Sequence, residues 1–262
     1  KSHMSNKRRN LTRDDNEDVI TYQHQRNLLK SSETFLSSIK VDLKCKNERQ
    51  KDLINSIKNN AVTFCEGSPG TGKTFLSLLE GIKFLKSGEY KKIVLVKSVT
   101  TLEEESLGYL KGDLDTKLIP IMYSFTGNLD KIVGKFNTEQ LKVQGYIEWM
   151  PIAYLRGVNI DNSYIVIDEA QNISIDGIRT ILSRVSESSK IVILGDSKQK
   201  DIKNKNDSSL EFIIKYFKEI PNIGIVRFEK EHIIRNPMIK DFEDRFDKLN
   251  EDGTIDSLKK RY

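Results

Sequence analysis

The strongest chemical signal in the chain is the segment Gly67-Ser68-Pro69-Gly70-Thr71-Gly72-Lys73-Thr74. It matches G-x-x-x-x-G-K-[ST], in which glycines let the backbone curl so that several N–H groups face one anion. Lys73 can then reach the β- and γ-phosphates of a nucleotide, and the Thr74 hydroxyl is a hard oxygen ligand for Mg²⁺. The pattern predicts a phosphate-binding loop. The residues expected to contact the nucleotide in and after it are Gly67, Ser68, Pro69, Gly70, Thr71, Gly72, Lys73, Thr74 and Phe75.

Two carboxylates end an apolar run further along the chain. Ile165-Val166-Ile167 is followed directly by Asp168 and Glu169. In nucleotide hydrolases of this build, an aspartate at this position holds the metal and the next glutamate orients or deprotonates the attacking water. Taken alone, such a run is more often a strand that meets solvent. Its pairing with the upstream loop favours the hydrolase interpretation, with Asp168 and Thr74 as metal ligands.

A third polar segment, Gly195-Asp196-Ser197-Lys198-Gln199, follows another apolar run. A polar side chain at the end of such a strand can touch the γ-phosphate and report whether it is present. Gln199 is the candidate for that role. An ordinary polar loop after a strand is the alternative.

The elements that must position these residues alternate along the chain. Continuous Ile/Val runs separated by amphipathic helical patterns are typical of a parallel sheet covered by helices on both faces. The sequence therefore predicts an α/β fold in which residues 98–160 form a long excursion between the second and third strands. Strands are predicted at 61–65, 92–96, 164–167, 191–194 and 223–228, and helices at 28–39, 48–58, 72–86, 175–185, 209–218 and 237–249.

Composition narrows the class of protein without identifying a partner. Of 262 residues, 37% are hydrophobic and 31% charged, which allows a sizeable core, and the net charge of +5 is weak evidence for nucleic acid. No apolar stretch approaches the length of a membrane-spanning helix. Two cysteines cannot build a disulfide framework or a four-ligand zinc site, so we expect a reduced, cytoplasmic protein (host cytoplasm for a phage-encoded chain).

With these motifs in view, the chain resembles the PhoH-like protein family of phosphate-loop ATPases, which is related to superfamily 1 helicases. The likeness covers roughly residues 45–245 and is closest to a shorter, phage-like branch without an added nuclease domain. It implies a single RecA-like P-loop NTPase domain, with a mainly parallel sheet sandwiched by helices, and ATP and Mg²⁺ as cofactors. The matching segments are 67–74, 107–113 (L-G-Y-L-K-G-D), 151–157 (P-I-A-Y-L-R-G), 168–172 (D-E-A-Q-N), 189–199 and 235–237 (R-N-P).

The resemblance also implies roles for residues outside the loop. Gln50 corresponds to a glutamine that contacts the adenine edge, and a solvent-facing helix residue is the alternative. Arg235 corresponds to an arginine near the γ-phosphate, and a surface ion pair is the alternative. Arg184 is a weaker candidate for the same role and Arg156 a weaker one still, and for each a scaffold salt bridge or an RNA phosphate contact is the alternative. One departure is Lys97-Ser98 after the second strand, where family members often carry Arg-Pro.

Three function classes follow from the resemblance. The favoured one is an ATPase coupled to single-stranded RNA or DNA as a helicase-like motor. A nucleotide-gated binding or regulatory module with slow hydrolysis and an ATP-assisted ribonuclease are the alternatives. Because the chain holds one ATPase lobe, we expect a homo-oligomer with ATP at subunit interfaces and an arginine donated in trans, with a hexameric ring as the form suggested by the family likeness.

The expected domain organisation combines this likeness with the local composition of the chain. The divisions are an expression-tag remnant at 1–4, a flexible segment at 5–25, a helical lead-in at 26–60, the ATPase domain at 61–250 and a tail at 251–262.

Several other side chains receive ordinary structural interpretations. The aromatic residues are expected in the core, with base-stacking platforms as the alternative. The lysine-rich segment 198–205 is expected to be a solvated loop, with contact to a nucleic-acid backbone as the alternative. The aromatic residues concerned are Trp149, Tyr123, Phe125, Phe212, Tyr216 and Phe217.

Overall fold

The computed structural model describes residues 34–98, 114–155, 159–198 and 209–254. The chain divides into two compact units, residues 1–40 and residues 41–262. In the first unit, residues 34–38 are helical, which agrees with the end of the helix predicted from Leu28, and the start of that helix lies outside the described residues. The second unit contains the sheet and all the elements discussed below.

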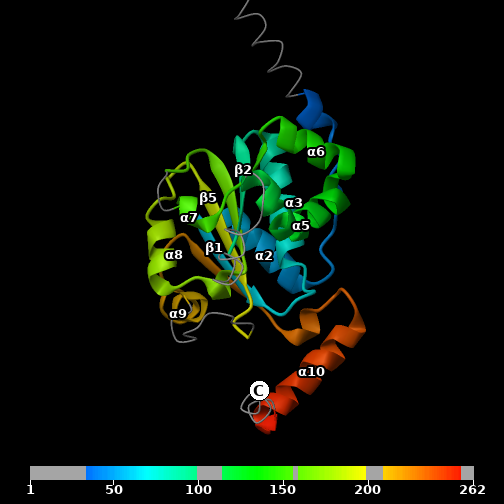
Figure 1. Ribbon diagram of the computed structural model, residues 1–262, viewed down its shortest axis with the longest axis vertical. Coiled ribbons are helices and arrows are strands. Elements are labelled where there is room, and N and C mark those ends of the chain that lie inside the picture. The colour runs from blue at the N-terminus through cyan, green and yellow to red at the C-terminus, as the bar shows by residue number, and fades with distance from the viewer. Residues whose placement is uncertain (1–33, 99–113, 156–158, 199–208, 255–262) are drawn as a thin grey trace, which may run out of the picture. The chain divides into compact units, whose positions relative to one another are not determined.

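The second unit is built on one six-stranded sheet in the order β3-β2-β4-β5-β1-β6 (Figure 1). Every neighbouring pair of strands is parallel, which confirms the predicted α/β class. The strands are β1 Val62–Gly67, β2 Lys92–Lys97, β3 Ile147–Trp149, β4 Ser163–Asp168, β5 Lys190–Gly195 and β6 Ile223–Phe228.

The two central strands explain why the apolar runs are continuous. All six residues of β4 and all six of β5 are buried, as expected for strands covered on both faces. Because β5 lies between β1 and β4, the carboxyl ends of these three strands meet at the same edge of the sheet. Ligands of open parallel sheets bind outside this edge.

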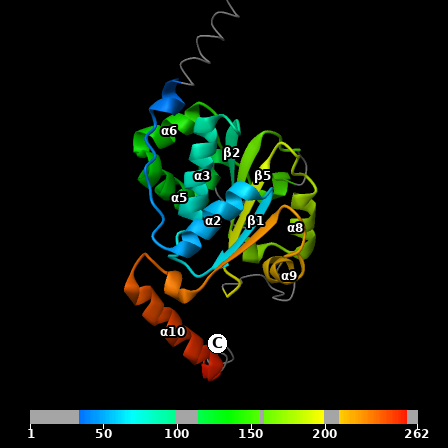
Figure 2. The same cartoon turned by 180° about the vertical axis from the view of Figure 1, so that it is seen from behind.

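Helices form a layer on each face of the sheet. Helices α2, α3, α5 and α6 lie on one face, and α8 and α9 lie on the other (Figures 1 and 2). The α-helices are α2 Glu48–Asn59, α3 Lys73–Ser87, α5 Leu114–Val133, α6 Lys135–Val143, α7 Ile152–Leu155, α8 Ile175–Leu182, α9 Ser209–Tyr216 and α10 Pro237–Glu251, with short 3₁₀ turns η1 Ala170–Asn172 and η3 Lys230–His232. None of the helices described combines the length and apolarity needed to cross a bilayer.

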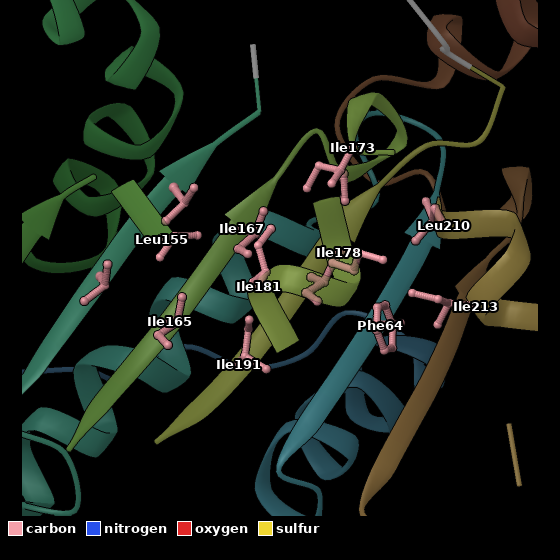
Figure 3. Packing of buried hydrophobic residues seen from close by; sticks show 14 of the residues in the cluster. Phe64, Leu155, Ile165, Ile167, Ile173, Ile178, Ile181, Ile191, Leu210 and Ile213 are labelled. Carbon is pink, nitrogen blue, oxygen red and sulfur yellow. The ribbon is translucent and has the colours of Figure 1, made fainter. Parts of the chain in front are cut away.

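The main core lies between the sheet and the layer formed by α8 and α9 (Figure 3). Branched aliphatic side chains dominate it, and Phe64 of β1 extends it toward α9. On the opposite face, the Tyr164 hydroxyl donates to the Ser77 carbonyl oxygen in α3 at 2.9 Å. Gly81 permits that approach, because a Cβ there would lie 2.8 Å from the Tyr164 ring. These contacts fix α3, and with it the start of the helix that follows the phosphate-binding loop.

The segment between β2 and β4 departs from the sequence prediction. It contributes a sixth strand, β3, which pairs with β2 at one edge of the sheet, whereas five strands were predicted. The strand was missed because it is only three residues long and partly exposed, so it shows no continuous apolar run. The same segment contains α5 and α6, which cover one face of the sheet and for which no helix was predicted.

The predicted placement of the aromatic residues was partly wrong. Phe125 is fully buried, as expected, but Tyr123 is 69% exposed and Tyr216 is 60% exposed. Residues two positions apart on a helix point to different sides, so Phe125 and Tyr123 of α5 cannot both face the core. Phe212 is also exposed, and Trp149 is only half-buried, with the Lys142 ammonium 4.7 Å from its ring centroid.

Candidate nucleotide-binding site

The loop between β1 and α3 has the backbone that the glycine pattern predicts. Gly70 and Gly72 have φ angles of 83° and 92°, in the left-handed region that glycine enters at little cost. A Cβ on Gly67 would lie 2.5 Å from Phe228 Cβ, so no larger residue fits beside β6. The Thr71 hydroxyl donates to the Ser68 carbonyl oxygen at 3.1 Å and closes the turn. The loop is therefore a preformed curl at the end of β1.

Lys73 is the first residue of α3 and lies directly behind this curl. Its ammonium donates to the carbonyl oxygens of Gly67 and Ser68, the latter at 3.0 Å. The fifteen-residue helix also directs its positive end toward the loop. A phosphate held there would meet backbone N–H groups, the helix dipole and the Lys73 charge together.

Thr74 and Asp168 bring two hard oxygen atoms together from α3 and β4. The Thr74 hydroxyl donates to Asp168 Oδ2 at 3.0 Å, and Asp168 Oδ1 accepts from the Glu169 backbone N–H at 3.0 Å. Burial and the neighbouring Glu169 charge raise the pKa of Asp168, while the Glu169 N–H, Lys73 and the Thr74 hydroxyl act in the opposite direction. This oxygen pair suits Mg²⁺, which is commonly bound by one or two protein oxygens plus substrate phosphates.

No group of three or more His, Cys, Asp or Glu side chains suited to a metal ion occurs among the residues that the structure describes.

Glu169 is positioned by a hydrogen-bonded neighbour that the sequence analysis did not single out. Gln171 Nε2 donates to Glu169 Oε2 at 2.7 Å, and Gln171 Oε1 accepts from the Asp196 N–H at 3.0 Å. Gln171 is fully buried, so these two bonds hold it between the ends of β4 and β5. Glu169 itself has a left-handed backbone, with φ at 60°. The only sequence signal for Gln171 is its place within the segment 168–172.

The loop after β5 carries Asp196, which was also missed. Its side chain is buried, and its Oδ1 accepts from the Lys198 N–H at 3.0 Å, whereas Oδ2 has no hydrogen-bond partner among the described residues. Burial raises the pKa of this carboxyl group. Gln199, the predicted γ-phosphate sensor, lies outside the described residues. The structure therefore places the start of its loop beside the phosphate-binding loop but not Gln199 itself.

Gln50, at the start of α2, is buried and contacts the phosphate-binding loop. Its Nε2 donates to the Thr71 carbonyl oxygen at 3.0 Å, and its Oε1 accepts from the Lys46 N–H at 2.7 Å. The solvent-facing alternative is therefore excluded. Here the amide joins the segment before α2 to the loop.

Arg235 is exposed and lies beside Gly70 of the loop. Its Cβ is 3.2 Å from the position that a Cβ on Gly70 would occupy, and the Ile234 N–H donates to the Gly70 carbonyl oxygen at 3.0 Å. Within the described part of the chain, Arg235 forms no ion pair. Arg184 is exposed and does not line the cavity, and Arg156 lies outside the described residues.

These residues surround a cavity of about 650 Å³. Its second wall is formed by Ser124, Asn128 and Lys131, which lie on one face of α5 and were not predicted. Polar residues at helical spacing are common on any exposed helix, so the sequence of the segment between β2 and β4 did not indicate that these three face a site. Among the described residues, the lining consists of Leu43, Lys44, Lys46, Gln50, Pro69, Gly70, Gly72, Lys73, Thr74, Phe75, Leu76, Ser124, Asn128, Lys131, Asp168, Glu169, Gly195, Asp196, Ile234 and Arg235.

The family model described as PhoH-like protein matches residues 42–247, which include this cavity's lining. The chain belongs to the PhoH-like protein family. A PhoH-like protein of Bacillus subtilis is 33% identical over 208 residues, covering 79% of this chain and 65% of the relative. A PhoH-like protein of Synechocystis is 30% identical over 198 residues, covering 76% and 60%. Protein PhoH of Escherichia coli is 30% identical over 195 residues, covering 74% and 55%.

The chain thus spans 55% to 65% of the length of these three PhoH-like relatives. Among solved structures, it is similar to the large terminase from a thermophilic bacteriophage. That likeness has a TM-score of 0.41 and 11% sequence identity, and it covers 71% of this chain and 46% of the terminase chain. Such a distant likeness does not bear on function. Family membership and the loop identify the chain as a PhoH-like protein with a P-loop nucleotide-binding fold.

Proposed function

We propose that the chain is a Mg²⁺-dependent ATPase. This proposal depends on one observation. The phosphate-binding loop, the Thr74–Asp168 oxygen pair and Glu169 all line the same cavity. Each part supports one requirement of phosphoryl transfer to water: binding the phosphates, neutralising their charge and orienting the nucleophile.

In this mechanism the loop N–H groups and Lys73 bind the β- and γ-phosphates. For this, the Lys73 ammonium exchanges the carbonyl oxygens of Gly67 and Ser68 for phosphate oxygens. Thr74 and Asp168 would hold Mg²⁺, whose chemistry is to neutralise charge on the phosphates. Glu169 orients the attacking water and accepts its proton, and Gln171 keeps the Glu169 carboxylate in place.

Three further residues take secondary roles in this proposal. Arg235 neutralises charge on the transferred phosphoryl group from within the same chain, because it lines its own cavity. Donation of an arginine in trans at a subunit interface, which the sequence analysis predicted, stays a prediction. Gln199 contacts the γ-phosphate, and Gln50 contacts the adenine edge while keeping its bond to the loop.

We further propose that hydrolysis is coupled to single-stranded RNA or DNA and that the chain self-associates. The support is the family's relation to superfamily 1 helicases, motors in which a second lobe completes the nucleotide site. The test measures ATP turnover with Mg²⁺, with and without single-stranded RNA or DNA of mixed sequence. Stimulated turnover is expected. Equal turnover in all samples would contradict coupling and favour a nucleotide-gated module, and metal-dependent cleavage of the RNA on a gel would favour a ribonuclease.

A further inference from the structure

Helix α10 presents a stripe of large apolar side chains to the outside. Met238, Phe242 and Phe246 are 56%, 55% and 56% exposed. Because they are four residues apart, they share one face of the helix. Residues of this type are usually buried, and a contiguous exposed group of them marks an interaction surface. We call these three residues the α10 stripe.

The opposite side of α10 is attached to its own domain by charges. Lys230 forms ion pairs with Asp244 and Asp247 at 2.7 and 2.6 Å, and Lys198 pairs with Asp247 at 2.9 Å. At helical spacing, Asp244 and Asp247 lie on the far side of the helix from Phe242. An amphipathic helix on a protein surface usually turns its apolar side toward its own domain. Helix α10 is inverted in this sense, because the side that carries Asp244 and Asp247 faces its own domain.

None of the described side chains of α10 is buried. Both ribbon views show α10 leading away from the sheet and its covering helices (Figures 1 and 2). The helix thus gains little from packing on its own domain, and its apolar stripe is available to another surface.

We propose that α10 packs antiparallel against α10 of a second copy of this chain, stripe to stripe. The charges beside the stripe favour this occupant. Asp241 and Arg245 are exposed, one turn apart, along the same edge of the stripe. In an antiparallel pair, Asp241 of each copy faces Arg245 of the other, so the surface is complementary to itself, as a two-fold interface requires.

This interface adjoins the cavity in each copy. Helix α10 starts two residues after Arg235, and Ile239 Cδ1 lies 3.5 Å from the position of a Cβ on Gly70. Pairing of α10 would therefore restrain Arg235 beside the loop. The inference rests on the proposed self-association but not on the proposed ATP hydrolysis, so the two can fail separately.

Sedimentation equilibrium of the full chain over a concentration series tests the pairing without nucleotide. The wild-type chain is expected to form dimers or larger even-numbered assemblies. Phe242→Ser should weaken self-association by at least about tenfold, because one large aromatic side chain leaves the interface. Two controls carry the same new residue on other exposed positions, namely Lys240→Ser on the opposite side of α10 and Tyr216→Ser on α9, and both should associate like wild type.

A charge-exchange experiment tests the antiparallel arrangement and does not depend on losing an apolar residue. Asp241→Arg alone and Arg245→Asp alone should each weaken self-association, because like charges then face each other across the pair. Mixing these two variants should restore association as a heterodimer, and the double variant should restore the homodimer.

The possible results distinguish self-association, the α10 pairing and the proposed ATP hydrolysis from one another. A wild-type monomer at every concentration would overturn self-association and the α10 pairing together, leaving the proposed hydrolysis intact. An oligomer unaffected by Phe242→Ser would overturn the α10 assignment alone, and loss of single-stranded RNA binding by the same variant would then assign the stripe to nucleic acid. Loss of association in Tyr216→Ser would overturn the stripe-to-stripe arrangement in favour of a head-to-tail contact.

Discussion

The sequence predicted the residues of one wall of the cavity but not those of the other. One wall is the phosphate-binding loop with Lys73, Thr74 and Asp168, and the other is the face of α5 with Asn128 and Lys131. The first wall depends on local backbone geometry, which demands particular residue types at fixed spacing. The second depends on how a long segment between β2 and β4 packs back on the sheet, and side chains on such a helix face can vary. The comparison predicts large effects for changes in the loop wall and small ones for changes in the α5 wall.

The largest effect is expected for Lys73→Ala. Loss of a charge-assisted contact to the phosphates should reduce the affinity for MgATP by roughly a hundredfold and abolish measurable turnover. Equilibrium binding of a fluorescent ATP analogue and a phosphate-release assay measure the two quantities. Lys91→Ala is the matched control, because Lys91 is exposed before β2 and lines neither wall. Wild-type binding by the Lys73→Ala chain would show that the loop is not the phosphate site.

Glu169→Gln should separate binding from chemistry. The amide keeps the size of the side chain but cannot accept a proton from water, so kcat should fall by roughly 10²–10⁴-fold while ATP affinity stays near wild type. Rapid-quench turnover together with equilibrium binding makes the comparison. Glu187→Gln, at an exposed position in the turn before β5, should change neither quantity. Normal turnover by the Glu169→Gln chain would assign the base elsewhere.

Asp168 makes the loop wall sensitive to pH. Burial and the Glu169 charge raise its pKa in the folded chain, so folding favours the protonated form. Its contribution to stability is therefore present at low pH and is lost as the pH rises through the raised pKa. Without nucleotide, Asp168→Asn should be more stable than wild type at neutral pH, and the difference should shrink on acidification. Urea unfolding at neutral and mildly acidic pH measures this, and a variant less stable than wild type at neutral pH would contradict it.

Asp168 also links this pH dependence to ligand binding. The carboxylate must be ionised to hold Mg²⁺, so acidification should weaken Mg²⁺-dependent nucleotide binding at a higher pH than an exposed aspartate would. A pH series of MgATP affinity measures this effect, with nucleotide binding in the absence of Mg²⁺ as the reference.

The smallest effect is expected on the α5 wall. Lys131 is exposed at the cavity, so Lys131→Ala should weaken ATP affinity by only about two- to fivefold. Lys135→Ala, four residues further along and outside the lining, should have no effect. The difference should also diminish at high salt, because exposed charges are screened. A loss as large as that of Lys73→Ala would show that both walls bind the phosphates directly.

The parts of the fold that depend on residues close together in the chain could be predicted from the sequence. The apolar runs predicted five of the six strands, and the loop motif predicted the curl at the end of β1 with its left-handed Gly70 and Gly72. The short edge strand β3 and the exposure of Tyr123 could not be predicted, because both depend on which side of an element meets the rest of the fold.

The same distinction applies to the candidate site. Thr74 and Asp168 were predicted to act together, and the structure places their oxygen atoms 3.0 Å apart. Gln171 was missed because its two hydrogen bonds join the ends of β4 and β5, a pairing that depends on strand order rather than on spacing in the chain. The inverted helix α10 was predicted as a helix, but its apolar side was not predicted to face outward.

The proposed ATPase mechanism requires a triphosphate in the loop, with its terminal phosphate between Lys73 and Glu169. A crystal structure of the chain with Mg²⁺ and a non-hydrolysable ATP analogue tests it most directly. We expect the Lys73 ammonium to leave the carbonyl oxygens of Gly67 and Ser68 for the phosphates, with Mg²⁺ beside Thr74 and Asp168. A nucleotide bound elsewhere, or a loop that stays empty at saturating analogue, would contradict it.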